Sequence, residues 1–189
     1  MVYFIGMKIM YYNKDINLHK LKYELELLKR FELMDYKSAI TPVEINHKLD
    51  FDVKGDDANA TTFKHLIDAL RYLYNTRPDI YRAVRMVSRF MNKSKWSHYQ
   101  ANVRILRCIK WTLKYEVLFL SDVEIDSKLI CYSDSDWCGD KVDRRSTFRY
   151  LFKYLGGPIS WCSKKKPVIA LSTYEVEYIA GALTTCQAA

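Results

Sequence analysis

The chain has 189 residues, of which 49% are hydrophobic, and a formal net charge of +8 from 30 Lys and Arg against 22 Asp and Glu. This length accommodates one large domain or two small ones with a buried core. No run approaches the roughly 18 apolar residues of a membrane-spanning helix, which excludes an integral helical membrane protein. The first residues also lack the basic and apolar regions of a signal peptide, so we expect an intracellular protein, cytoplasmic or nuclear and not secreted.

The cysteines and the charge narrow the function class further. The five cysteines are scattered, without the close spacing of a zinc knuckle or a redox motif, and this predicts free thiols in a reducing compartment. The excess of basic residues suits a polyanionic partner such as a nucleic acid.

The N-terminal part predicts a β-hairpin followed by an amphipathic helix. Residues 3–12 are rich in aromatic, β-branched and methionine side chains, residues 13–15 form a polar turn, and residues 16–18 alternate again. Between 21 and 33 the apolar spacing becomes helical. Pro42 ends this unit, because the residue before a proline is disfavoured in the helical region.

The middle of the chain predicts a loop and three helices. Residues 43–62 show little periodicity and are interpreted as an exposed loop or linker. Helical patterns follow at 63–74, at 77–91 with Pro78 near the N-terminus, and at 97–115.

The helix at 97–115 has two distinct faces at the helical period. An apolar face carries Ile105, Leu106, Ile109 and Leu113. A second face carries four cations, which we call the basic row: Arg104, Arg107, Lys110 and Lys114. The row is interpreted either as the solvated face of a core helix or as a track along a phosphate backbone, where such cations displace counterions.

The last third predicts strands and a final helix. Residues 128–134 are apolar on both faces, as in a central strand. Strands at 148–155 and 158–162 are separated by a turn at Gly156-Gly157, and a helix begins near Thr173.

Two carboxylates in this last third are candidate metal ligands. Asp134 ends the predicted strand, and Glu177 lies on the final helix beside Ala180 and Gly181, whose small side chains allow close approach to a sheet. Glu175 has a different role, because it forms a capping box with Ser172. The alternative interpretation is that both carboxylates are ordinary surface residues.

Several motifs, in order along the chain, closely resemble the Pol polyprotein of copia-type (Ty1/copia) retrotransposons. The C-terminal motifs resemble its ribonuclease H domain: Tyr132-Ser-Asp-Ser-Asp-Trp-Cys-Gly-Asp140, Asp143-Arg-Arg-Ser-Thr147, Gly157-Pro-Ile-Ser-Trp161, Ser163-Lys-Lys165 and residues 170–180. The upstream motifs resemble the primer-grip hairpin, thumb and connection of its reverse transcriptase: Tyr3-Phe-Ile-Gly6, residues 27–31, Thr41-Pro42, Tyr72-Leu73, Thr76-Arg-Pro-Asp-Ile80, Ser88-Arg-Phe-Met91 and residues 104–112.

The resemblance implies an α+β fold: a β-hairpin, a helical thumb and connection region, and a truncated ribonuclease H-like βββα unit. The expected division is 1–42 for the primer-grip hairpin and thumb-like helix, 43–62 for a linker, 63–125 for the connection region, and 126–189 for the ribonuclease H-like domain.

The resemblance also implies chemistry for individual residues. It places the family's first catalytic aspartate on Asp134 and its catalytic glutamate on Glu177, which with two further groups hold a Mg²⁺ pair that cuts the RNA strand of an RNA–DNA hybrid. Asp136 matches the second aspartate of the motif, where we expect local hydrogen bonding. The expected partners are an RNA–DNA hybrid or other nucleic acid, bound by the basic row, and the remainder of the polyprotein.

The chain contains neither the Tyr-x-Asp-Asp motif of the polymerase nor a third ribonuclease H aspartate, so we expect a truncated piece that is inactive alone. The alternatives are an incomplete gene model of an active polyprotein and a domesticated nucleic-acid-binding protein. Chains of this kind can also be labelled as secreted effectors.

At five positions the sequence departs from relatives that usually have glycine or another small residue: Asp68, Trp111, Glu116, Phe148 and Arg149. Asp68 and Trp111 put larger side chains on helices otherwise suited to close packing. Gly-to-Asp, Gly-to-Glu, Gly-to-Arg and Ser-to-Phe changes can each follow from one C-to-T change on one strand or the other, which suggests a decaying copy of an element.

Overall fold

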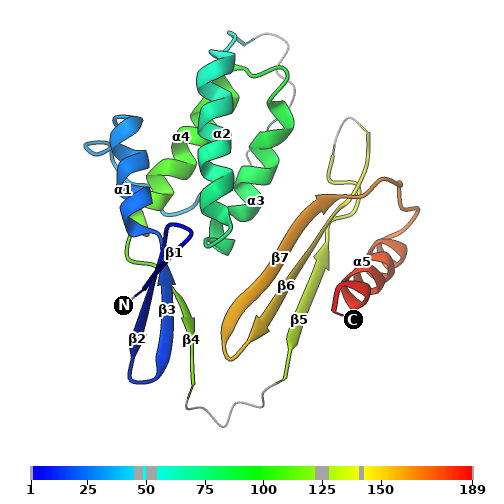
Figure 1. Cartoon of the computed structure of the whole chain (residues 1–189). Coiled ribbons are helices and arrows are strands. Elements are labelled where there is room, and N and C mark those ends of the chain that lie inside the picture. Colours follow the sequence, from blue (N-terminus) through cyan, green and yellow to red (C-terminus); the bar gives the residue numbers. More distant parts are fainter. Residues whose placement is uncertain (1, 45–48, 50–54, 122–127, 141–142, 189) are drawn as a thin grey trace. The chain divides into compact units, whose positions relative to one another are not determined.

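The computed structural model describes residues 2–44, 49, 55–121, 128–140 and 143–188. These residues form an α+β structure with helices and two sheets, which confirms the α+β class, while the assignment of its parts to a thumb, a connection and a ribonuclease H-like unit stays a prediction (Figure 1). The chain divides into two compact units, Met1–Tyr12 with Asn17–Val117 and Asn13–Ile16 with Leu118–Ala189. No helix in the described part is long and apolar enough to cross a membrane.

The first strands differ from the single long strand predicted for residues 3–12. Strand β1 (Val2–Phe4) pairs antiparallel with β2 (Met7–Tyr12). The prediction was wrong because Ile5 and Gly6 both have positive φ angles, 47° and 71°, and so turn the chain between the two strands. Strand β3 (Asp15–His19) and the unforeseen β4 (Val117–Phe119) complete the sheet in the order β1-β2-β3-β4.

The helices follow the predicted order with small shifts at their ends. They are α1 (Leu21–Arg30), α2 (Ala60–Tyr74), α3 (Pro78–Val87) with a short 3₁₀ turn η1 (Ser88–Phe90), and α4 (Trp96–Trp111). Pro78 is the first residue of α3, where a missing backbone N–H leaves no helical hydrogen bond unmade. The predicted linker at 43–62 falls partly outside the described residues.

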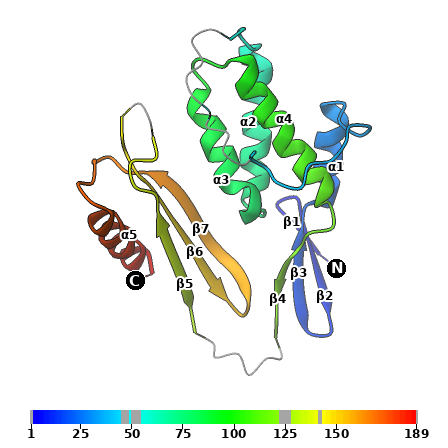
Figure 2. The same ribbon diagram turned by 180° about the vertical axis from the view of Figure 1, so that it is seen from behind.

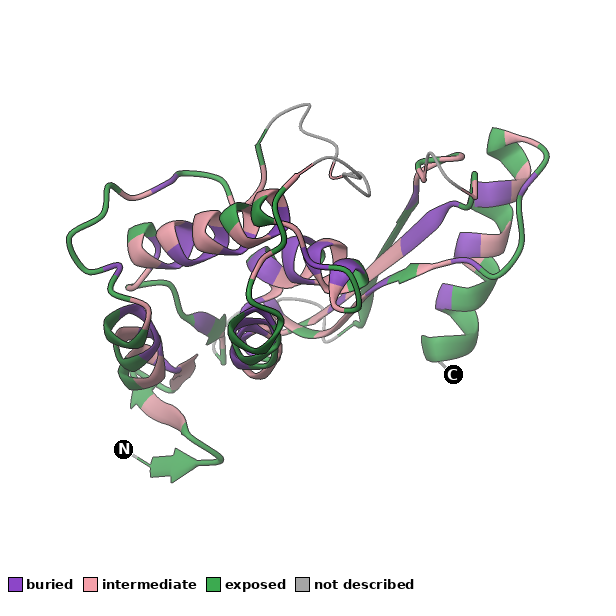
Figure 3. Cartoon of the chain, turned by 90° about the horizontal axis from the view of Figure 1, so that it is seen from above, coloured by how far each residue is buried: buried purple, intermediate pink, exposed green. Residues whose placement is uncertain are grey.

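The helices bury one apolar core. Their predicted apolar faces meet in it, and Figure 3 shows the buried residues in purple. The fully buried members include Leu28, Phe63, Leu66, Ile67, Leu70, Leu73, Ile80, Leu106 and Ile109. Asp68 and Trp111, the larger side chains noted on these helices, are both exposed and lie outside this core.

A buried ion-pair cluster lies next to this core. The Arg77 guanidinium donates to the Glu24 carboxylate on α1 at 2.7 Å and to both carboxylate oxygens of Asp79 at 2.9 and 2.7 Å. It also donates to the Thr112 hydroxyl, just beyond the end of α4. One arginine therefore joins α1, the start of α3 and the end of α4.

The C-terminal unit consists of a three-stranded antiparallel sheet and one helix. Strands β5 (Ile130–Ser135), β6 (Thr147–Tyr154) and β7 (Gly157–Lys165) lie in the order β5-β6-β7, and α5 (Thr173–Ala188) packs against β5 (Figures 1 and 2). The prediction of a buried central strand ending at Asp134 was wrong: β5 is an edge strand of the described sheet, and its side chains are largely exposed.

The two faces of this sheet differ in burial. Phe148 and Phe152 of β6 are buried on one face, and the ring of Tyr150 between them is tilted by 47° to that of Phe152, with the two centroids 5.0 Å apart. Val176 and Ala180 form the buried stripe of α5, four residues apart as one helix face requires. Because side chains alternate along a strand, Arg149 and its cross-strand partner Asp134 project from the opposite face.

The two compact units do not test the four-part division expected from the sequence. Their boundary in the C-terminal half lies between Val117 and Leu118, whereas the predicted boundary at 125/126 lies outside the described residues. The four-part division remains a prediction.

Candidate functional site

Asp134 lies one residue before the end of β5, where its carboxylate is held by an arginine. The strand register places Asp134 directly opposite Arg149 of β6. The Arg149 Nη1 atom donates to Asp134 Oδ2 at 2.6 Å, and its Nη2 atom lies 3.5 Å from Asp136 Oδ2. The Asp134 side chain is 63% exposed and that of Arg149 only 24%. The candidate ligand is therefore accessible but already paired.

Asp136 makes the local hydrogen bonds expected from the sequence. Its Oδ1 accepts from the Thr147 backbone N–H at 2.6 Å, and its own N–H donates to the Thr147 carbonyl at 3.1 Å. A Cβ atom at Gly139 would lie 2.7 Å from the Asp136 carboxylate carbon, so a larger residue at this position would displace that carboxylate. Asp136 thereby ties the chain after β5 to the start of β6.

Glu177 lies on the first turns of α5 and is exposed. It makes no hydrogen bond or ion pair with the described residues. Its charge acts on Lys166, which is buried and donates to the Val176 carbonyl. Burial lowers the pKa of Lys166, against the opposing attraction of Glu177 and Asp136. The structure thus brings Glu177 onto a helix that packs on β5 without joining it to Asp134.

The start of α5 has nearly the predicted cap. The Ser172 hydroxyl accepts from the Glu175 N–H at 3.1 Å, as expected. The Glu175 carboxylate, however, accepts from the N–H of Leu171 at 2.7 Å and not from that of Ser172. The cap therefore differs from the predicted capping box only in the backbone N–H that Glu175 binds, and α5 begins at Thr173 as predicted.

A second basic side chain, Lys165, forms ion pairs with the next two acids along the chain, Asp140 and Asp143. Lys165 Nζ lies 2.6 Å from Asp140 Oδ2 and 2.8 Å from Asp143 Oδ2. Although slight burial opposes it, the hydrogen bond from Lys165 lowers the pKa of Asp143. The sequence did not predict the ion pairs of Arg149 and Lys165, because Arg149 stood out only as a departure from a small residue. The signal available was the series of acids at 134–143 followed by bases on the later strands.

These contacts decide whether the residues suit a divalent metal ion. Mg²⁺ requires several oxygen ligands in octahedral geometry. Among the described residues no group of three Asp, Glu, His or Cys side chains is arranged to hold a metal, and Asp134 is paired with a guanidinium. The described residues by themselves therefore do not fit a Mg²⁺ pair, and Mg²⁺ binding at Asp134 and Glu177 stays a prediction.

Three members of the basic row contact the chain's own segment at residues 34–44, which we call the covering segment. Arg104 donates to Glu44 at 3.0 Å, Arg107 to the Lys37 carbonyl at 2.6 Å, and Lys110 to the carbonyls of Met34 and Tyr36. Lys114, the fourth member, is exposed and makes no such contact with the described residues. The row thus fastens a segment to α4, and its binding of nucleic acid remains a prediction.

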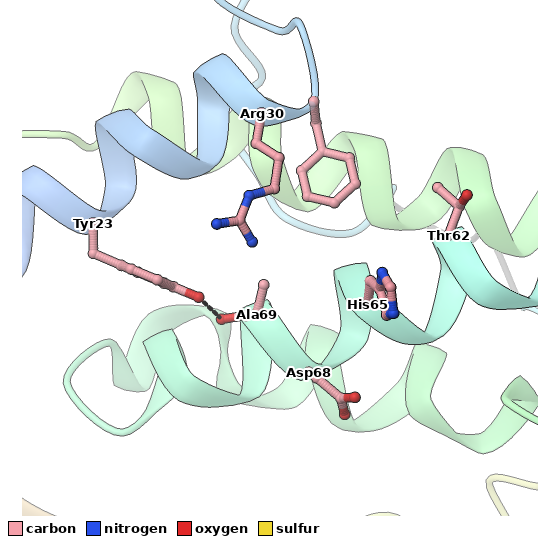
Figure 4. Close-up of a pocket in the computed structure, with 7 residues that line it drawn as sticks. Tyr23, Arg30, Thr62, His65, Asp68 and Ala69 are labelled. Atoms are coloured by element: carbon pink, nitrogen blue, oxygen red, sulfur yellow. Dashed lines mark hydrogen bonds between the residues drawn. The ribbon is translucent and has the colours of Figure 1, made fainter.

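A hollow of about 460 Å³ lies between α1 and α2 (Figure 4). Arg30 and His65 line it together with Asp68, and the Tyr23 hydroxyl donates to the Ala69 carbonyl at 3.3 Å. Most of its lining side chains are exposed, so it is a shallow surface feature. The five cysteines, all of them described, have free thiols, as predicted.

Three relatives show the range of known proteins to which this chain is similar. The retrovirus-related Pol polyprotein from transposon RE1 of Arabidopsis thaliana is 35% identical over 186 residues, which are 98% of this chain and 12% of the relative. An uncharacterized mitochondrial protein of the same plant is 32% identical over 98% of this chain and 76% of its own length. The secreted RxLR effector protein 161 of Plasmopara viticola is 44% identical over 60% of this chain and 80% of its own length.

The match to the transposon proteins covers nearly all of this chain but little of theirs. The chain spans 12–14% of the length of three plant Pol polyproteins that it matches at 32–35% identity. No protein-family model matches the sequence. No solved structure matches it either.

Proposed function

Because the chain belongs to the Pol polyproteins of copia-type retrotransposons, we propose that it binds RNA–DNA hybrids as the part of such a polyprotein that links a reverse transcriptase to a ribonuclease H. In this proposal β1 and β2 correspond to the primer-grip hairpin and α2 to α4 to the connection region. Residues 128–188 are the first part of a ribonuclease H-like unit.

One observation carries this proposal most directly. The last described segment is an antiparallel β5–β6–β7 sheet followed by a helix that packs on β5, which is the βββα order expected for a ribonuclease H-like unit. Asp134 and Glu177, the two residues with a catalytic role in the resemblance, lie on β5 and on that helix. The fold therefore supports assigning them as the remnants of one site.

The same geometry supports a chain that binds without cutting. The Asp134 carboxylate is paired with Arg149, and Glu177 is not joined to it. Since the described residues do not fit Mg²⁺, we assign no catalytic step to this chain. In this proposal, polar and basic side chains on its helices and strands contact the phosphate backbone of the hybrid.

Binding can be measured by fluorescence anisotropy with a labelled RNA–DNA hybrid at several salt concentrations. The logarithm of the association constant should fall linearly with that of the salt concentration, with a slope of roughly −0.9 for each phosphate neutralised. Lys114→Ala should make this slope about one unit shallower, because Lys114 is the row member without a contact to the covering segment.

Lys22→Ala is the matched control, since Lys22 is an exposed lysine on α1 with only a long contact to Glu26. It should leave the slope unchanged. No binding at low salt, or binding that salt does not weaken, would contradict the proposal.

Cleavage is the second measurement. Purified protein incubated with a hybrid and Mg²⁺ should leave the RNA strand intact. RNA cutting that disappears in Asp134→Asn would show that the chain is an active ribonuclease and would refute this part of the proposal.

A further inference from the structure

The pairing of Arg149 with two carboxylates has the form of a cation site filled by the protein itself. Arg149 lies across from Asp134 in the register, and its Nη1 and Nη2 atoms approach Asp134 and Asp136 at 2.6 and 3.5 Å. Its Nε atom is buried and makes no hydrogen bond with a described residue. The two carboxylates therefore position the guanidinium, and both of them contact its η nitrogens.

The same arrangement recurs along the chain after β5. Lys165 lies between Asp140 and Asp143 at 2.6 and 2.8 Å. Each of these two pairs of acids thus shares one basic side chain, Arg149 from β6 or Lys165 from β7, and Asp143 has a further contact with Arg145 at 3.6 Å. This repetition shows that the acids of the segment are compensated by cations of the chain.

We propose that Arg149 is a built-in cation that takes the place of a divalent metal ion at the Asp134 and Asp136 carboxylates and closes them to Mg²⁺. The meaning of this closure for cleavage rests on the proposed function, but the closure itself is a property of this end of the sheet.

Charge and geometry both favour the arginine over a metal ion. Two carboxylates carry two negative charges, and the guanidinium reduces this to a net charge of −1. The positive charge of the guanidinium also repels a divalent cation placed beside it. A guanidinium is planar, matches carboxylate oxygens and keeps its charge at any pH that the fold survives. Mg²⁺ must instead shed tightly held water and find further ligands.

The test is a Mn²⁺ titration of the full chain followed by paramagnetic broadening of amide NMR signals. The wild type should show no selective broadening around Asp134, Asp136 and Thr147. Arg149→Gln removes the charge but keeps a long polar side chain. It should broaden these signals at a Mn²⁺ concentration at least about tenfold lower than any that affects them in the wild type. Arg149→Lys keeps the charge and should behave like the wild type.

Three further variants complete the design. Arg145→Ala removes an arginine that pairs with Asp143 at 3.6 Å, and it should not change Mn²⁺ binding at Asp134. Adding Asp134→Asn to Arg149→Gln should abolish the gained site. Arg149→Ala serves as the second charge-removing variant, and far-UV circular dichroism establishes that each variant is folded.

The inference is overturned if the wild type and Arg149→Gln bind Mn²⁺ equally at Asp134, or if neither charge-removing variant gains a site. These outcomes are independent of hybrid binding, because no nucleic acid is present. A chain that binds no hybrid but gains the Mn²⁺ site in Arg149→Gln would refute the proposed function and leave the inference standing.

Discussion

Glu24 shows how a single buried residue can make stability depend on pH. Its side chain is 2% exposed, and desolvation raises its pKa from an ordinary value of 4.5 to about 7, although Arg77 opposes this shift. Asp79 adds to the rise, because it shares the same guanidinium and repels a second negative charge. For Arg77, burial favours the neutral form, but Asp79 and Glu24 outweigh it and hold the pKa above its usual value.

The sign of the pH dependence follows from these values. Between about pH 4.5 and 7 the folded chain keeps a proton on Glu24 that the unfolded chain has lost. The contribution of Glu24 to the free energy of unfolding is therefore full below pH 4.5. This contribution is lost as pH rises through about 7, which lowers the free energy of unfolding by about 3 kcal/mol in total. Glu24→Gln should remove this fall, as measured by urea unfolding from pH 5 to 8.

Glu26→Gln is the control for this prediction. Glu26 lies on the same helix but is largely exposed, and its ion pair with Lys22 is 4.0 Å long. Its removal should leave the pH dependence in place. A Glu24→Gln chain whose stability follows the wild-type pH curve would contradict the assignment.

At this scale the site was only partly predictable. The positions of Asp134 and Asp136 at a strand end follow from the sequence pattern. The pairing of Asp134 with Arg149 does not, because it depends on the register, and a slip of one residue would place Arg149 on the other face. The partners of the basic row were also hidden, since the covering segment has no periodicity that marks it as a neighbour of α4.

Among the elements, α5 shows how a local signal can place a boundary well. Its predicted start at Thr173 is confirmed, because Ser172 and Glu175 form a cap that needs no information beyond four consecutive residues. Pro78 fixed the start of α3 in the same way. The strand β4 escaped prediction because three residues carry no periodicity and its pairing is set by distant parts of the chain.

The cap of α5 gives a prediction about this element. Ser172→Ala should lower the stability of the C-terminal unit by about 1 kcal/mol, because the Glu175 N–H loses its acceptor. Urea unfolding of the variant measures this loss. Gln187→Ala, an exposed change near the other end of α5, should stay within about 0.5 kcal/mol of the wild type. Equal effects of the two changes would show that the cap is not stabilising.

The whole molecule has two units with very different cores. The helices of the first unit bury a large set of Leu, Ile, Val and Phe side chains. In the second unit the buried hydrophobic residues are few among those described: Phe148, Phe152, Ala170, Val176 and Ala180. Since stability rises with buried apolar area, the first unit should be the more stable of the two.

Hydrogen exchange can test this difference. The amides of Leu66, Ile67 and Leu70 in α2 should exchange far more slowly than those of β5, which is an exposed edge strand. In denaturant, the protection of β6 and β7 should disappear before that of α2. Loss of protection in both units at one denaturant concentration would mean that they unfold together.

The buried ion-pair cluster around Arg77 in the first unit also determines the order in which its residues can be replaced. If Glu24 is replaced first, Arg77 keeps the carboxylate of Asp79, which holds it with two hydrogen bonds. If Arg77 is replaced first, Glu24 is left buried with no cation and the Thr112 hydroxyl loses its donor. Substitutions at these positions are thus tolerated along one route and not along its reverse. A reading frame that drifts without selection should lose the helical unit at the step that removes Arg77.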